Sequence, residues 1–132
     1  MNDCVIDASA LVLALIGKTE AAGALRARMP QMRRHAPHLI DAEVGNVLRR
    51  HERAGLISAH EADTALRVSG VLIDHRYPHA GALAQRAWTL GHNLNFYDAL
   101  YVALAGYLNL PLLTADARIG RAPGLPCQTE MA

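Results

Sequence analysis

The sequence lacks several features that define whole classes of protein. It has only two cysteines, Cys4 and Cys127, and we expect both to be free thiols because two distant cysteines do not make a disulfide framework. No apolar run approaches the roughly 20 residues that span a bilayer, and the first residues carry no basic region of a secretory signal. These absences favour a cytoplasmic protein.

Other absences narrow the chemistry. The sequence has no internal repeat, no low-complexity segment and no linker, so 132 residues with 52% hydrophobic content predict a single domain spanning 1–132. Its seven histidines show no pairing that suits zinc. No glycine-rich phosphate loop follows the first apolar run, which disfavours a nucleotide-binding enzyme.

What the chain does have is an alternation of short apolar runs and helical patterns, which is typical of α/β domains. The runs predict strands at 4–6, 35–36, 71–73 and 112–114, and a last short strand at 127–129. The helical patterns predict helices over 10–16, 20–29, 39–54, 58–69, 79–90, 95–108 and a turn at 117–120. Ser58 and Glu61 form the spacing of a capping box, and Gly70 is interpreted as the stop of the helix that they open.

Four acids stand beside strongly apolar segments: Asp7, Glu43, Asp98 and Asp116. Asp7 and Asp116 end strands, and Glu43 and Asp98 lie near the starts of helices. In an open parallel sheet the carboxyl ends of the strands and the starts of the returning helices share one edge. Four carboxylates in one crevice would repel one another, and Mg²⁺ or Mn²⁺ is the natural compensation.

Each acid also has a purely structural interpretation. Asp7 and Asp116 could cap the helical segments that follow them. Asn95 and Asp98 are spaced like a capping pair, and Glu43 could face solvent one turn into its helix.

Polar neighbours could support the acids. Ser9 stands two residues after Asp7 and Thr114 two before Asp116, so each could hydrogen-bond a carboxylate or a metal-bound water. Asn46 shares a helical face with Glu43 and could touch a phosphate or steady Glu43. Local capping or an exposed position would explain the same residues.

The basic residues are nearly all arginine, 12 of 13. Net charge is +1, but the thirteen basic residues set against the eight acids outside the crevice would leave +5, which is compatible with a nucleic-acid face. Arg118 and Arg121, which follow Asp116, are the first candidates for contact with an RNA backbone, and Arg49 and Arg50 are weaker ones.

The ordered set of acids resembles a known family. Residues 5–11 (VIDASAL) resemble the opening motif of PIN-domain ribonucleases, in particular of VapC toxins from bacterial toxin–antitoxin pairs. Residues 43–50 (EVGNVLRR), 97–105 (YDALYVALA) and 113–116 (LTAD) resemble the second, third and fourth motifs, in order and at similar separations.

The resemblance implies a three-layer α/β/α domain with a short, mostly parallel sheet. It implies magnesium-dependent endonucleolytic cleavage of RNA by a metal-activated water, with Asp7, Glu43, Asp98 and Asp116 as the catalytic acids. Asp7 and Asp98 would bind Mg²⁺ directly, and Glu43 and Asp116 through water, with Mn²⁺ as a substitute. It also implies a homodimer and a VapB-like antitoxin that blocks the site.

Three rival functions stay open at this level. The same fold could merely hold RNA, as a non-catalytic PIN-like module whose acids are helix caps. A different Mg²⁺ enzyme, such as a phosphatase or deoxyribonuclease, could use similar acids, although an aspartyl-phosphate phosphatase usually has a second aspartate where this chain has Ser9. The apolar helix after Asn95 could instead serve a structural oligomer.

Overall fold

The central feature of the fold is one parallel sheet. The structure, a computed structural model, describes residues 2–132; Met1 and the side chain of His92 lie outside its description. The strands lie in the order β3-β2-β1-β4-β5, and every neighbouring pair is parallel. Their bounds are β1 Asn2–Ile6, β2 Met32–Pro37, β3 His75–Tyr77, β4 Leu112–Thr114 and β5 Thr129–Met131.

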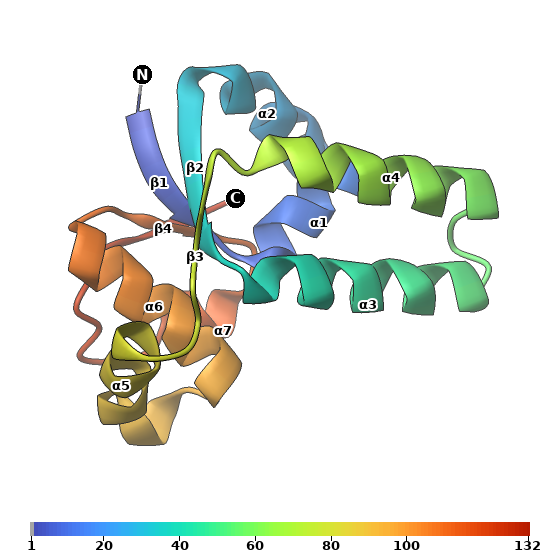
Figure 1. Cartoon of the computed structure of the whole chain (residues 1–132). Helices are drawn as coiled ribbons and strands as arrows, with labels where there is room; N and C mark the ends of the chain where they lie inside the picture. The colour runs from blue at the N-terminus through green and yellow to red at the C-terminus, as the bar shows by residue number, and fades with distance from the viewer. Residues whose placement is uncertain (1) are drawn as a thin grey trace.

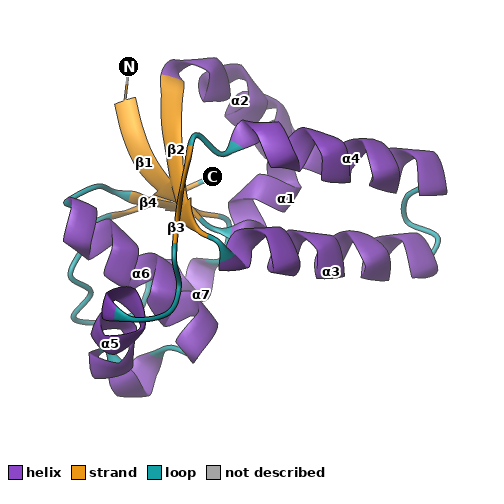
Figure 2. Cartoon of the chain, viewed as in Figure 1, coloured by secondary structure: helices purple, strands orange, loops and turns teal. Residues whose placement is uncertain are grey.

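Helices cover both faces of this sheet, which confirms the predicted three-layer α/β/α architecture. Figures 1 and 2 show α1, α3 and α4 on one side and α5 and α6 on the other, with the α3–α4 pair projecting away from the strands. The helices are α1 Ala8–Ile16, α2 Glu20–Arg28, α3 Leu39–Arg53, α4 Ala59–Leu72, α5 Ala82–Thr89, α6 Phe96–Leu108 and α7 Ala117–Gly120, with 3₁₀ turns at Met29–Gln31 and Gly91–Asn93.

The core sits on the two central strands. Val5, Ile6, Leu112 and Leu113 are essentially inaccessible to solvent, as expected for parallel strands that are covered on both faces. On α6 all seven residues of Ala99–Ala105 are buried. A helix that is buried on every face is a core helix. α6 therefore fixes the residues of its first turn, including Asp98, relative to the sheet.

The register brings two chain segments to one edge of the sheet. Ile6 of β1 pairs with Leu113 of β4, so Asp7 and the residues that follow Thr114 leave the sheet side by side. The backbone N–H of Asp7 donates to the Leu113 carbonyl at 3.2 Å. Two residues more than 100 positions apart in the sequence are thereby fixed as neighbours.

The prediction of a strand at 71–73 is wrong, because α4 continues to Leu72. Gly70 does not stop the helix: its φ is not positive, and a glycine inside a helix is only mildly unfavourable. The end of α4 is stabilised instead by Arg34, whose Nε donates to the Leu72 carbonyl at 2.5 Å. The strand follows at β3, whose polar sequence suits the edge of a sheet and gives no apolar signal.

Smaller differences concern the ends of several elements; the strand predicted at 35–36, for example, runs over Met32–Pro37. The last strand runs over Thr129–Met131, later than the predicted 127–129. The helix predicted over 79–90 begins only at Ala82, because Gly81 before it adopts a φ of 70° that no helix permits. Both cysteines are free, as predicted.

No single helix in the described part of the chain is long and apolar enough to cross a membrane; α1 and Glu20–Gln31 meet that test only as a pair, bent by 103°.

Candidate active site

Asp7 is a buried carboxylate with both oxygens occupied. It ends β1 and caps α1, its Oδ1 accepting from the Ala10 N–H at 3.0 Å and from Ser9 Oγ at 2.6 Å. Its Oδ2 accepts a short hydrogen bond from Thr114 Oγ1. Only 4% of Asp7 is exposed, and burial raises its pKa although these hydrogen bonds favour the charged form. Capping alone does not require such burial, since most helix caps lie at the surface.

Ser9 and Thr114 join the ends of β1 and β4. Ser9 Oγ accepts from the Ala115 N–H at 2.9 Å, and Thr114 Oγ1 accepts from the Asp116 N–H at 3.0 Å. The two hydroxyls lie 3.3 Å apart. The predicted contact of these hydroxyls with a site carboxylate is therefore present, and it orients Asp7 from two directions.

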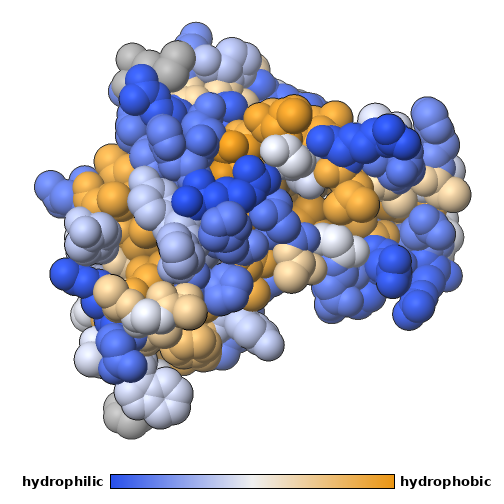
Figure 3. All heavy atoms as spheres, viewed as in Figure 1, coloured by the Kyte–Doolittle hydropathy of each residue, from blue (hydrophilic) through white to orange (hydrophobic). Residues whose placement is uncertain are grey.

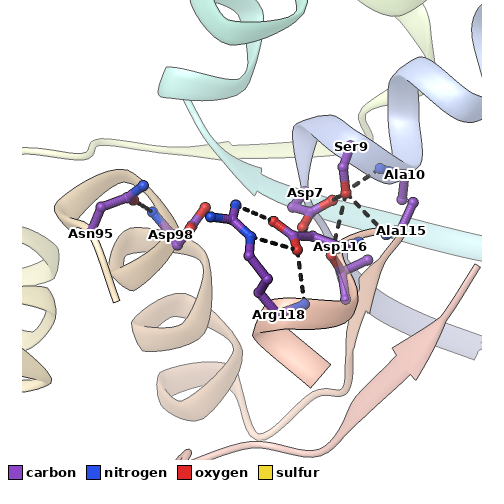
Figure 4. A network of polar contacts seen from close by, with 9 residues as sticks. Asp7, Ser9, Ala10, Asn95, Asp98, Ala115, Asp116 and Arg118 are labelled. Carbon is purple, nitrogen blue, oxygen red and sulfur yellow. Dashed lines mark hydrogen bonds and ion pairs between the residues drawn. The ribbon is translucent and has the colours of Figure 1, made fainter. Parts of the chain in front are cut away.

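Asp116 has a different environment, shown in Figure 4. It caps α7 by accepting the Arg118 N–H at 2.9 Å. The Arg118 guanidinium grips the same carboxylate, Nε to Oδ1 at 3.1 Å and Nη2 to Oδ2 at 2.7 Å. These hydrogen bonds with Arg118 lower the pKa of Asp116, which favours its charged form. The other three acids have raised pKa values.

Glu43 and Asp98 join the group of acids from two other helices. Glu43 lies in the second turn of α3, and its Oε1 accepts from the hydroxyl of Tyr101 at 2.6 Å. Asp98 lies in the first turn of α6, which Asn95 caps through the Asp98 N–H at 2.8 Å. Figure 4 shows the Arg118 side chain lying between Asp98 and Asp116.

The four carboxylates influence one another electrostatically. Burial raises the pKa of Glu43, and the charges of Asp98 and Asp7 add to that rise. Burial likewise raises the pKa of Asp98, with the charges of Asp116 and Asp7 adding to it. Of the ion pairs in the described part of the chain, none includes Asp7, Glu43 or Asp98. Asp7 and Glu43 thus lie beside other acids without an ion pair to a described cation, and the charge of Arg118 offsets only part of the rise in the pKa of Asp98.

A divalent cation would relieve this repulsion, and the donor set suits it. Carboxylate oxygens are the ligands that Mg²⁺ and Mn²⁺ prefer. Among the side chains that the structure describes, however, no three His, Cys, Asp or Glu residues have the spacing of a finished metal centre. The ligand atoms suit Mg²⁺ or Mn²⁺, whereas the described side chains do not form a preorganised coordination site.

The other predicted site residues lie farther out. Asn46 is exposed on α3, as are Arg49 and Arg50 in the half of that helix beyond Glu43. Arg121 is exposed beside α7, and its charge helps to lower the pKa of Asp116. The structure therefore brings Ser9 and Thr114 to the acids, and it leaves Asn46, Arg49 and Arg50 at the surface.

Tyr101 is the site residue that the sequence did not assign. Its position inside an apolar helix favours core packing, and it is indeed 1% exposed. The available signal was its spacing, since Asp98 and Tyr101 are three residues apart and so share a helix face.

The raised pKa values predict that the metal-free protein is more stable in mild acid than at neutral pH. A carboxyl group whose pKa is higher folded than unfolded binds more protons when folded, so the free energy of unfolding falls as pH rises from the ordinary carboxyl range through the raised pKa. Asp7, Glu43 and Asp98 act in this direction. Asp98→Asn should therefore raise Tm near pH 7 by about 2–5 °C and flatten the pH dependence.

Thermal unfolding in EDTA between about pH 5 and about pH 8 measures this effect. Asp63→Asn is the control, because Asp63 is exposed and pairs only with Arg67 one turn along α4. A lower Tm for Asp98→Asn at neutral pH would contradict the expectation.

Comparison with known proteins places the chain in a family. The PIN domain model matches residues 4–125. Ribonuclease VapC1 of Mycobacterium tuberculosis is 50% identical over 131 residues, which cover 99% of this chain and 98% of that protein.

Solved structures share the fold at low sequence identity. The Mycobacterium tuberculosis toxin VapC20, which cleaves the sarcin–ricin loop, superposes with a TM-score of 0.71 at 14% identity, covering 95% of this chain and 98% of that one. VapBC2 from Rickettsia felis, bound to a DNA fragment from its promoter, gives 0.69 at 12% identity, with 98% of both chains covered. The extent of the domain match and the identity to VapC1 show that the chain belongs to the PIN-domain family of VapC ribonucleases.

Proposed function

We propose that this protein is a magnesium-dependent endoribonuclease that acts as the toxin of a toxin–antitoxin pair. The observation that carries the proposal is the gathering of Asp7, Glu43 and Asp98, each of which has its pKa raised first by burial and then by the charge of at least one other of the four acids. Such an arrangement is unfavourable for stability and is typical of a functional site. The family supports RNA as the substrate.

Asp7 and Asp98 are the proposed direct ligands of Mg²⁺, with Mn²⁺ as a substitute, and Glu43 and Asp116 bind it through water. When bound, the metal supplies a Lewis acid for a phosphate oxygen and a water of lowered pKa. Ser9 and Thr114 hold the Asp7 carboxylate in one orientation through their hydrogen bonds. The ligand that lies deepest in the site is thus also the most rigidly held.

Glu43 and Asp116 divide the remaining roles by their protonation. A group that takes a proton works best when its pKa approaches the working pH; burial raises the pKa of Glu43 in the metal-free protein, and Glu43 is the proposed acceptor of the proton of the attacking water. Asp116 has a lowered pKa and stays charged, so it orients that water. The water oxygen attacks phosphorus in line, the bond from phosphorus to the 3′ oxygen breaks, and that oxygen takes a proton from solvent, which leaves a 5′ phosphate and a 3′ hydroxyl.

Arginines at the rim are the proposed contacts for the RNA backbone. Arg118 is well exposed, although the carboxylate of Asp116 holds its guanidinium. It lies beside the developing charge, where fixed positive groups stabilise phosphoryl transfer most. Arg121, Arg49 and Arg50 are exposed and extend this surface more weakly.

The decisive experiment is cleavage of RNA by purified protein that is stripped of metal and then supplied with Mg²⁺. We expect internal cleavage with Mg²⁺, its loss in EDTA, and recovery with excess Mg²⁺ or Mn²⁺. Sequencing of the RNA ends identifies the bond that breaks. Binding of RNA without cleavage in Mg²⁺ would support the alternative, a non-catalytic PIN-like module, and would refute the nuclease.

We also propose that an antitoxin of the VapB type docks in a groove away from the acids. The groove has a volume of about 710 Å³, and α1, α2 and α4 line it with apolar side chains, among them Leu15, Ile16, Met29 and Val68. Figure 3 shows apolar side chains exposed over the adjoining half of α4, where Val71 is 77% exposed. Several solved structures of similar fold are toxin–antitoxin complexes, which supports a partner protein as the occupant.

A homodimer is the proposed assembly, through a second exposed surface. The aromatic patch comprises Trp88, Phe96, Tyr97 and Tyr107 on α5 and α6, all exposed. Trp88 is therefore not a core residue; it meets Phe96 edge to face at 6.1 Å. Exposed aromatics of this kind typically anchor interfaces.

Trp88→Ser is expected to weaken the dimer at least about tenfold, because a central aromatic residue dominates interface energy. Light scattering during size-exclusion chromatography over a concentration series measures the mass. Val71→Ser is a matched control, since it removes an exposed apolar side chain from the opposite layer. Equal masses for the Trp88 variant and the wild type at every concentration would exclude this patch as the interface.

A further inference from the structure

The hydroxyl of Tyr101 has a position that core packing does not explain. Tyr101 is among the largest fully buried side chains of the protein, and it lies within the buried run Ala99–Ala105. Phenylalanine would fill the same volume without bringing a polar atom that needs a partner. The hydroxyl finds its partner in Glu43, at 2.6 Å from Oε1.

This hydrogen bond joins two helices of different layers at the site. Glu43 comes from α3 and Tyr101 from α6, helices that lie on opposite sides of the sheet (Figure 1). Asp98 stands one turn before Tyr101 on the same face of α6. The bond therefore fixes Glu43 against the helix that carries Asp98, and it sets the relative position of two of the four carboxylates.

The bond also divides the two oxygens of Glu43 between two tasks. A phenol has a single hydrogen to donate, and here Oε1 receives it. A phenol has an ordinary pKa of about 10, so the Tyr101 hydroxyl keeps its hydrogen at neutral pH and donates it to Glu43. No hydrogen bond among the described residues involves Oε2 of Glu43, so that oxygen is open to a cation or to the water that a cation holds.

We propose that Tyr101 is a positioning residue whose hydroxyl holds Glu43 in the orientation that the divalent cation and its water require. The inference rests on the proposed function, since it concerns uptake of the metal by the same site. Partners that orient metal-binding carboxylates typically change metal affinity or activity by 10–100-fold when they are removed.

Tyr101→Phe tests the proposal because it removes the hydroxyl and keeps the ring. We expect the dissociation constant for Mn²⁺, measured by calorimetry on metal-free protein without RNA, to rise about 10–100-fold. In the cleavage assay the metal concentration for half-maximal rate should rise likewise. Tyr77→Phe is the control: it also removes a tyrosine hydroxyl and keeps the ring, but that hydroxyl bonds to His35 Nδ1 at 2.7 Å and to none of the four acids. Its metal affinity should stay within about twofold of the wild type.

A double-mutant cycle separates positioning from packing. If Tyr101 acts through Glu43, adding Tyr101→Phe to Glu43→Ala should change Mn²⁺ affinity by less than about twofold, because the group that it positions is gone. A merely structural role predicts a lower Tm in EDTA for Tyr101→Phe with unchanged metal affinity, and that result would overturn the proposal. The cycle stays informative if Tyr101→Phe lowers stability. Metal affinity is compared only between folded proteins, with the substitution made once in the wild type and once in Glu43→Ala.

The outcomes also distinguish this inference from the proposed function. Wild-type protein that neither binds Mn²⁺ nor cleaves RNA would refute the function itself. Wild-type protein that does both, beside a Tyr101→Phe variant with the same metal affinity, would refute only the role of the hydroxyl.

Discussion

Asp7→Asn is expected to reduce RNA cleavage by about 10²–10³-fold or more, the usual effect of losing one fixed electrostatic group at a reacting centre. Asparagine keeps the size of the side chain and an oxygen that can accept from Ala10 and Ser9, so α1 stays capped. It removes the negative charge that the metal would bind. The fold should therefore survive while the chemistry is lost.

Initial rates with Mg²⁺ in excess and Tm in EDTA together measure both expectations. Asp63→Asn, which removes an equal charge from the exposed surface of α4, should cleave at the wild-type rate. Expression of the wild type without an antitoxin should arrest growth, and Asp7→Asn should relieve the arrest. A purified Asp7→Asn protein with full activity would remove Asp7 from the mechanism.

Gly17→Ala is expected to lower the free energy of unfolding by about 2–3 kcal/mol, a fall in Tm of about 10 °C. Gly17 follows α1, and its backbone torsions are ordinary, so the constraint is space and not conformation. An added Cβ would lie 2.4 Å from the Leu13 carbonyl oxygen and 2.7 Å from the Ala22 Cβ. Both contacts lie in the packed turn between α1 and α2. In Gly17→Ala this turn has to open to make room for the added methyl group.

Gly23→Ala provides the matched comparison for thermal unfolding. It adds the same methyl group inside α2, where nothing lies within 4 Å of the new Cβ, and it should stabilise the protein by about 0.5–1 kcal/mol through helix propensity. Opposite signs for the two substitutions are the expected result. A Gly17→Ala protein as stable as the wild type would show that the turn relaxes freely.

The sequence predicts most of the fold because its signals are local and agree with one another. Apolar runs mark β1 and β4, and Thr19 and Ser58 cap the helices that follow them. The positions of Asp7 and Asp116 then follow from the geometry of parallel strands. The failure at 71–73 has the opposite cause: the end of α4 depends on Arg34, a residue distant in sequence, and β3 depends on its neighbour β2.

The site is predictable to the same degree. Acids at strand ends and helix starts can be recognised in one dimension, whereas hydrogen bonds between helices cannot. In the sequence, Tyr101 looks like any other residue of an apolar helix. Its role becomes visible only in the fold, where α3 places Glu43 within hydrogen-bond distance of its hydroxyl. Arg118 likewise follows Asp116 in the sequence, but only the turn at α7 folds its guanidinium back onto that carboxylate.

The order of the strands has a consequence for synthesis on the ribosome. β1 is translated more than 100 residues before β4, the strand with which it pairs. Until residues 112–116 leave the exit tunnel, Asp7 lacks its hydrogen bond from Thr114, Ser9 lacks the Ala115 amide, and Asp116 has not joined the other acids. A nascent chain therefore holds an incomplete group of acids until β4 and residues 115–116 have joined β1.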